Sequence, residues 1–159
     1  MDKLFKLLEN NARLSNKELA VMLGETEEAV AERISRYENE GIIRGYKSVI
    51  NWDKVDNEHV TALIEIKVTP KRGHGFEEIA QRITQLDEVE SLYLMSGAYD
   101  FAVMITGKTF QDVAMFVAKR LSPLDSVLST ATHFILRRYK DMGIELSPVS
   151  GDDRGIVSL

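Results

Sequence analysis

The chain has 159 residues, enough for one domain of average size or two small ones. It has no cysteine, which excludes disulfides and thiolate metal sites, and its net charge of −5 argues against a strongly basic coat for nucleic acid. No apolar run approaches the roughly 20 residues that span a bilayer, and the start MDKLFKLLENN carries acidic residues, unlike a signal peptide. We therefore expect a cytoplasmic protein with no membrane contact.

Three short amphipathic helices are predicted within the first 40 residues. A Ser-x-x-Glu capping box opens the second helix, a threonine can cap the third, and apolar residues then recur at i, i+4 and i+7. A glycine ends the third helix, and an extended strand is predicted over 42–50. The residues that carry these predictions are Leu4, Phe5, Leu8, Ser15, Glu18, Thr26, Val30, Ile34, Tyr37 and Gly41.

The second and third of these helices have the spacing of a helix-turn-helix. Ala20 allows the two helices to cross closely, Gly24 supplies a turn with positive φ, and Val30 seats the second helix. Such a unit holds its second helix in the major groove of DNA. The polar stretch NWDKVDNE, residues 51–58, is predicted to be a linker.

The rest of the chain has the order strand, helix, strand, strand, helix, strand. The strands are predicted over 60–68, 89–95, 101–106 and 127–139, and the helices over 76–83 and 110–121. This order gives a ferredoxin-like antiparallel sheet with both helices on one face. The other face, with residues such as Tyr93, Met95 and Phe134 or their neighbours, needs a cover, and a second copy of the sheet would provide one.

A helix-turn-helix, the segment GIIRGY and a βαββαβ domain containing GAYD resemble the leucine-responsive/asparagine-regulator (Lrp/AsnC, feast/famine) family of transcription regulators over residues 2 to about 142. The resemblance implies an α+β protein with a winged helix-turn-helix domain over 1–50 and a linker over 51–58. The βαββαβ domain (regulation of amino-acid metabolism, RAM) over 59–142 would serve dimerisation and effector binding, and 143–159 would form a tail.

The resemblance further implies duplex DNA and an amino acid as binding partners, with no other cofactor. It implies dimers that pair through their sheets and assemble into octamers, with the effector bound between subunits. We expect a bacterial or archaeal, nucleoid-associated regulator. The alternatives are an amino-acid-binding oligomer whose DNA reader has decayed, or a small enzyme on the same scaffold. Since no nucleophile motif or metal-ligand spacing is present, we expect no enzymatic activity and no metal site.

The predicted recognition helix is acidic. With Val30 as its buried centre, two glutamates point outward, and residues 1–50 hold eight Lys or Arg against nine Asp or Glu. A single such domain should bind DNA weakly, because phosphate neutralisation supplies much of the affinity. The candidate DNA-binding residues are Lys17, Thr26, Glu28, Ala31, Glu32, Arg33, Ser35, Arg36, Arg44 and Lys47, with Arg13 as a further backbone clamp.

Two interpretations of the glutamates remain open. Glu27 and Glu28 can stabilise the helix N-terminus while Glu32 pairs with Arg36, or one glutamate can accept from a cytosine amino group. We favour the first, because it needs no partner. Arg33 and Arg36, the only cations on this helix, are the best candidates for phosphate or guanine contacts.

The GAYD corner is the candidate effector site. Gly97 would let backbone amides approach a carboxylate closely, and Asp100 would face the α-ammonium group of an amino acid. The alternative is an ordinary turn, in which glycine and aspartate are common. Tyr99 would be a lid or a dimer contact. Three hydroxyls of the last strand would complete the pocket: Ser129, Thr130 and Thr132.

Overall fold

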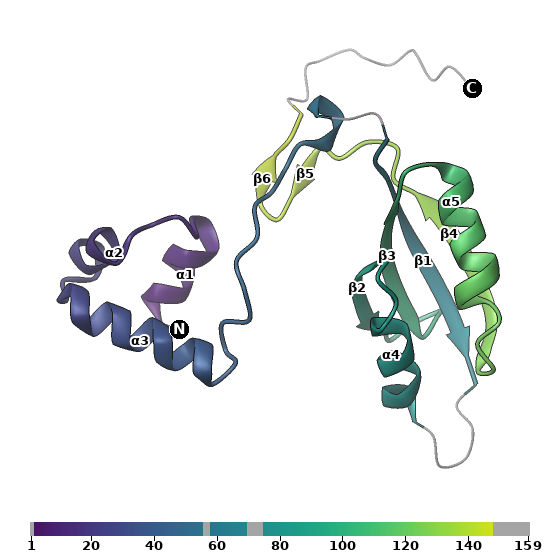
Figure 1. Cartoon of the computed structure of the whole chain (residues 1–159), viewed down its shortest axis with the longest axis horizontal. Helices are drawn as coiled ribbons and strands as arrows, with labels where there is room; N and C mark the ends of the chain where they lie inside the picture. The colour runs from purple at the N-terminus through teal and green to yellow at the C-terminus, as the bar shows by residue number, and fades with distance from the viewer. Residues whose placement is uncertain (1, 56–57, 70–74, 148–159) are drawn as a thin grey trace. The chain divides into compact units, whose positions relative to one another are not determined.

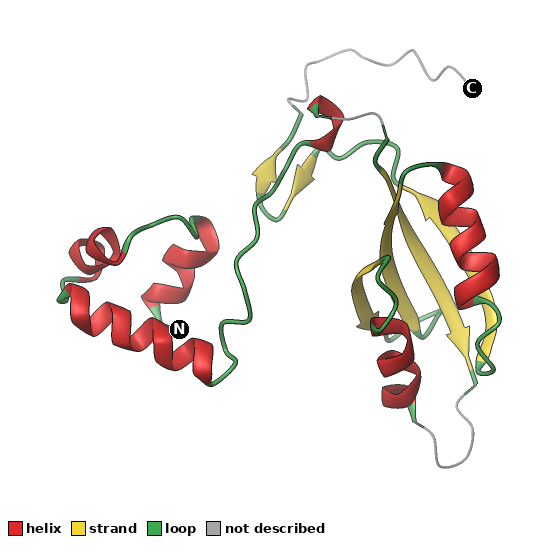
Figure 2. Ribbon diagram, viewed as in Figure 1, coloured by secondary structure: helices red, strands yellow, loops and turns green. Residues whose placement is uncertain are grey.

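The computed structural model describes residues 2–55, 58–69 and 75–147. The chain divides into two compact units, with the boundary between Val49 and Ile50. Each unit is described by itself below (Figures 1 and 2). Within the described residues, no helix is long and apolar enough to cross a membrane.

The first unit contains three helices around a small apolar core. They are α1 (Lys3–Asn10), α2 (Asn16–Leu23) and α3 (Glu27–Asn39). Leu4, Leu19, Ala20 and Val30 are buried at the centre. The small side chain of Ala20 lies where α2 and α3 meet, as the helix-turn-helix spacing predicts.

The predicted helix boundaries of this unit are confirmed by their capping groups. The Ser15 side chain accepts from the Glu18 amide, and the Glu18 carboxylate accepts from the Ser15 amide, which completes the capping box. Gly24 follows α2 with φ 70°, a left-handed conformation that glycine adopts without strain. Thr26 then caps α3 by accepting from the Ala29 amide at 3.2 Å.

The strand predicted after α3 is not formed. The amides of Ile42 and Ile43 both donate to the carbonyl of Tyr37, so the chain first turns back onto the end of α3. From 44 to 51 the backbone belongs to no helix or strand, and the predicted wing is therefore absent from the described residues. A strand needs a neighbouring strand with which to form hydrogen bonds. The spacing of apolar residues over 42–50 suggests an extended backbone, but it does not show that such a neighbour exists.

The second unit is the predicted ferredoxin-like fold. Its antiparallel sheet has the strand order β2-β3-β1-β4, and α4 and α5 lie on the same face of it (Figure 1). The elements are β1 (Val60–Val68), α4 (Phe76–Thr84), β2 (Val89–Leu94), β3 (Phe101–Gly107), α5 (Phe110–Phe116), a π-helical turn (Val117–Leu121) and β4 (Val127–Phe134).

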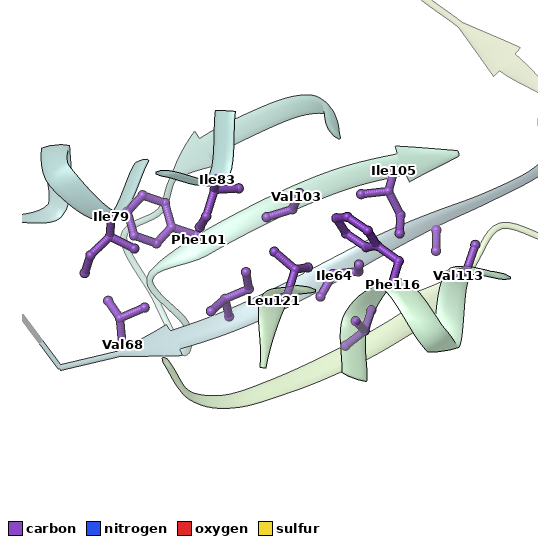
Figure 3. Packing of buried hydrophobic residues seen from close by; sticks show 13 residues of the cluster. Ile64, Val68, Ile79, Ile83, Phe101, Val103, Ile105, Val113, Phe116 and Leu121 are labelled. Atoms are coloured by element: carbon purple, nitrogen blue, oxygen red, sulfur yellow. The ribbon is translucent and has the colours of Figure 1, made fainter. Parts of the chain in front are cut away.

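The core of this unit lies between the sheet and the helices (Figure 3). Alternate residues of the central strand β1 face inward, and the adjacent strand β3 contributes Phe101, Val103 and Ile105 in the same way. The helices add Ile83 and Leu121. The inward residues of β1 are Ala62, Ile64, Ile66 and Val68.

The opposite face of the sheet carries no helix and is called here the open face. Leu63 and Glu65 lie on it, and the register places Tyr93 opposite Ala102 on the same side. Phe134 does not lie there, contrary to prediction. It pairs with inward-facing Ala62 and packs edge-to-face on the Phe110 ring, 4.8 Å between centroids.

The C-terminal part of the chain differs from prediction in two ways. Strand β4 ends at Phe134, five residues early: Phe134 pairs with Ala62, and the Ile135 amide makes one further hydrogen bond to the Thr61 carbonyl near the start of β1. The chain then forms a hairpin, β5 (Lys140–Asp141) with β6 (Ile144–Glu145), across the predicted start of the tail at residue 143. The predicted linker also contains a 3-10 turn, η1 (Trp52–Lys54). Residues 148–159 of the predicted tail lie outside the described residues.

Candidate DNA-binding helix and effector corner

The outer face of α3 carries the side chains that the helical period places there. Glu28, Glu32, Ser35 and Arg36 are exposed, and Ala31 beside them is half-buried. Ala31, Glu32, Ser35 and Arg36 line one open hollow together with Asn39 and Glu40. Thr26 lies at the start of this face, but its hydroxyl already accepts from the backbone as the helix cap.

Arg33 does not belong to this face. One guanidinium nitrogen, Nη1, lies 3.0 Å from Glu25 Oε1, and Nε lies 3.9 Å from Asp2 Oδ2. The side chain is only 21% exposed. Arg33 lies about 60° around the helix from Val30, so the same rotation that buries Val30 carries Arg33 inward. In this conformation Arg33 is engaged by acidic side chains of its own unit and does not belong to the outer face, so its role as a DNA contact stays a prediction.

Asp2, Glu25, Arg33 and Tyr37 form a cluster inside the first unit, and Asp2 is the acceptor at its centre. It caps α1 by accepting from the Leu4 amide at 3.0 Å, and its other oxygen accepts from the Tyr37 hydroxyl at 2.8 Å. The Leu4 amide, then Tyr37 and Arg33, hold the pKa of Asp2 below its ordinary value. The cluster ties the start of α1 to α3. Sequence analysis missed it, although Arg33 lies between the inward residues Val30 and Tyr37.

The interpretation of the glutamates is partly corrected. Among the described residues no ion pair joins Glu32 to Arg36, whose guanidinium instead lies 5.1 Å from the centroid of the neighbouring Tyr37 ring. Glu27 and Glu28 do occupy the first turn of α3, where the helix dipole favours negative charge. With Arg33 turned inward, the outer face of α3 is more acidic than the sequence count suggests.

The other predicted phosphate contacts surround α3 from neighbouring segments of the first unit. Lys17 is exposed in the first turn of α2, and Arg13 is exposed just before it. Arg44 and Lys47 are exposed on the extended segment that follows α3. This segment is held to the helix by the Tyr46 hydroxyl, which donates to Glu38 at 2.9 Å; burial and this bond raise the pKa of Tyr46.

In the second unit, Asp100 is bound into the sheet. Its Oδ2 accepts from the Val68 amide at 2.8 Å, while its own amide donates to the Ile66 carbonyl and its carbonyl accepts from Met95. Asp100 thus continues the β1–β3 ladder past the last paired residues. The carboxylate is a structural group as well as a candidate for an ammonium contact.

Gly97 shows no close approach within the subunit. Its φ is 159°, at the edge of the positive-φ region that other residues rarely adopt, and a Cβ built there would meet no atom within 4 Å. Within the subunit, the backbone conformation and not crowding favours glycine here. Tyr99, beside it, is half-buried.

The three predicted hydroxyls of β4 do not converge. Ser129 pairs with Lys67 on the open face, whereas Thr130 and Thr132 pair with Ile66 and Ile64 on the helix face. Thr130 Oγ1 lies 3.4 Å from Ser122 Oγ. Because side chains alternate along a strand, Ser129 points to the opposite face of this subunit from Thr130 and Thr132. One subunit therefore does not bring the three hydroxyls together, and their part in the effector site stays a prediction.

The two units together define a class of protein, one with a helix-turn-helix and a separate ligand-binding domain. Residues 3–38 match the AsnC-type helix-turn-helix domain, and residues 61–144 match the Lrp/AsnC ligand binding domain. The chain is 47% identical over 157 residues to YugG, an uncharacterised HTH-type transcriptional regulator of Bacillus subtilis strain 168, covering 98% of this chain and 95% of that one. The chain belongs to the Lrp/AsnC family.

Solved structures show the same fold. A transcriptional regulator from Neisseria meningitidis in complex with L-methionine superposes with a TM-score of 0.69, at 23% identity, over 88% of this chain and 90% of that chain. A feast or famine regulatory protein from M. tuberculosis, also complexed with L-methionine, superposes with a TM-score of 0.73 at 22% identity, over 91% of this chain and 95% of that one.

The Asp2 cluster gives a pH-dependent prediction. Because the folded pKa of Asp2 is lowered from its ordinary 3.8, its charge stabilises the first unit above that pH, and this contribution is lost as pH falls through the folded pKa. We expect Asp2→Asn, which keeps a capping oxygen but no charge, to lower stability by roughly 0.5–1 kcal/mol at neutral pH. Thermal melts followed by circular dichroism should show the difference disappearing in acid.

The control is Glu9→Gln, an exposed position in the last turn of the same helix; since the helix dipole disfavours negative charge there, loss of this charge should not lower stability at any pH. A constant difference between parent and Asp2→Asn down to the lowest pH would show that the Asp2 charge does not contribute to stability.

Proposed function

We propose that this protein is a transcription regulator that binds duplex DNA through α3 and whose DNA binding or assembly responds to an amino acid. The observation that carries the proposal is a capped, tightly packed helix-turn-helix whose second helix leaves its outer face exposed. The names of its relatives as transcriptional regulators support it.

DNA affinity is expected to come from the edges of the helix-turn-helix. Arg36 is the one cation exposed on α3 among the described residues, and Lys17, Arg44 and Lys47 can contact phosphates on either side. The glutamates of α3 oppose phosphate approach, so a single unit has little electrostatic affinity. Two units on two half-sites are needed for tight binding.

We propose that the open face of the sheet pairs with its copy in a dimer, and that dimers assemble further into closed rings, up to an octamer. The open face contains Leu63, Ala102, Met104 and Tyr93, and Tyr93 is 55% exposed. Glu65 and His133 add polar groups to the same face. The apolar part is of the kind that soluble proteins cover, and a two-fold axis covers both copies at once.

Light scattering tests the assembly. The parent should have at least the mass of a dimer at micromolar concentration, and Met104→Glu, which places a charge at the centre of the open face, should shift it toward the monomer. Gln81→Glu adds the same charge at an exposed position of α4 and should leave the mass unchanged. A monomeric parent would contradict the dimer.

Arg36 tests the DNA contact. If Arg36 binds phosphate, Arg36→Ala should weaken binding about equally on all sequences and reduce the salt slope by about one. If it contacts guanine, the variant should lose preference at one base position, at a cost of about 1–3 kcal/mol. Gel shifts on the promoter of the protein's own gene distinguish these outcomes.

Arg82→Ala, in α4 of the second unit, is the matched control, because its guanidinium is exposed and bound to Glu78. A parent that binds no DNA at any salt concentration would leave an amino-acid-binding oligomer with a decayed reader as the better description.

We propose that the effector binds at the GAYD corner. Asp100 keeps a second carboxylate oxygen, since only Oδ2 accepts from Val68. The L-methionine complexes of the similar structures support an amino acid as the ligand class. The hydroxyls of one subunit do not complete the site, which is consistent with a second subunit contributing to it.

Asp100 variants test this site by thermal shift against the twenty amino acids. Asp100→Asn keeps an acceptor for the Val68 amide but loses the charge, so it should fold like the parent and lose the ligand-induced shift. Asp100→Ala also leaves the Val68 amide unpaired and should cost about 1–2 kcal/mol of stability. A full ligand shift in Asp100→Asn would show that Asp100 acts only in the turn.

A further inference from the structure

The chain enters the second unit through a structured turn rather than a plain linker. In η1 the Lys54 amide donates to the Asn51 carbonyl at 3.1 Å, and the Val55 amide donates to the Trp52 carbonyl at 2.9 Å. The Trp52 ring stacks on His59, with 4.5 Å between centroids and 16° between planes. The residues that directly follow Val49, the last residue of the first unit, therefore have a defined conformation.

The C-terminal hairpin, which is distant in sequence, is hydrogen-bonded to the residue that precedes this turn. Asn51 Nδ2 donates to the carbonyl of Leu146 at 2.7 Å, across 95 positions. The Leu146 amide donates in turn to the Tyr139 carbonyl at 2.9 Å, which closes the hairpin. Met142 and Gly143 form its tip with φ 44° and 85°. Asn51 is thus bonded to a short, closed structure.

The hairpin is itself anchored to the sheet. Arg138 Nη2 donates to Thr61 Oγ1 at 2.7 Å, and Arg138 Nη1 lies 3.7 Å from Asp141 Oδ2. Thr61, on β1, is 4% exposed, and its carbonyl also accepts from the Ile135 amide at 2.9 Å. A buried position on the central strand therefore supports the hairpin, and through Asn51 it supports the entry turn.

We propose that the hairpin 140–146 and Asn51 form a C-terminal clamp that sets the direction in which the chain leaves the second unit toward the DNA-binding unit. This inference rests on the proposed function as a DNA-binding dimer. In such a dimer each DNA-binding unit must reach one half-site, and the half-site spacing is a geometric property of the protein. A fixed exit from each second unit narrows the spacings that both units can reach together.

Trp52 reports directly on the clamp, because it is the only tryptophan of the chain. Asn51→Ala removes the donor to Leu146, and a single hydrogen bond of this kind shifts a local equilibrium by about two- to tenfold. We expect at least a twofold increase in acrylamide quenching of Trp52 in the full-length variant. Gln81→Ala, which removes an exposed amide from α4, should leave the quenching unchanged.

A second variant disrupts the same clamp through a substitution in the hairpin. Leu146→Pro removes the amide that donates to Tyr139 and should increase Trp52 quenching in the same way. Unchanged quenching in both variants would overturn the clamp. This measurement needs no DNA, so its outcome is independent of the proposed function.

A comparison of half-site spacings tests whether the clamp restricts the spacings that the dimer can bind. Duplexes with two half-sites whose centres differ by half a helical turn, about five base pairs, are compared with a single half-site. The parent should prefer one spacing, and Asn51→Ala should reduce that preference by about two- to tenfold while binding the single half-site as the parent does. An unchanged preference in a variant with exposed Trp52 would overturn the inference. A parent that binds no DNA would overturn the proposed function instead.

Discussion

The second unit depends on the double pairing of one central strand. β1 is hydrogen-bonded to β3 on one side and to β4 on the other, and its inward residues form the middle of the core. The proposed effector corner and the C-terminal hairpin attach to opposite ends of it. Asp100 binds the amide of Val68 at one end, and Thr61 receives Arg138 near the other. Because a shift of one residue would exchange the two faces, the register of β1 determines the position of both.

The first unit shows a conflict between stability and DNA affinity. The cluster of Asp2, Glu25, Arg33 and Tyr37 ties α1 to α3, but it uses a cation that the outer face of α3 could have offered to phosphate. The charged side chains that remain exposed on α3 are mostly glutamates. The proposed DNA binding therefore relies on cations at the edges of the helix-turn-helix and on two units acting together.

The alternation of side chains along β4 has a similar consequence for the effector. Neighbouring hydroxyls on one strand point to opposite faces, so Ser129 and Thr130 serve different surfaces of the same sheet. The GAYD corner of a single subunit offers one partly engaged carboxylate and an open glycine. In the proposed function this links sensing to assembly, because one subunit offers only part of the proposed site.

The sequence by itself determined the features that depend on near neighbours. The capping box at Ser15, the left-handed turn at Gly24 and the alternation of β1 follow from residues within a few positions of each other, and all three are confirmed. The order of elements followed from such local patterns, whereas the family was suggested by the resemblance of the helix-turn-helix, GIIRGY and the GAYD-containing βαββαβ domain.

Only the tertiary structure decided the pairings between distant residues. Arg33 with Asp2, Asp100 with Val68 and Asn51 with Leu146 join parts of the chain from about 30 to 95 positions apart. Local periodicity shows which way a side chain points, but it does not show which group will be there to meet it. For the same reason the apolar spacing over 42–50 predicted a strand that has no partner.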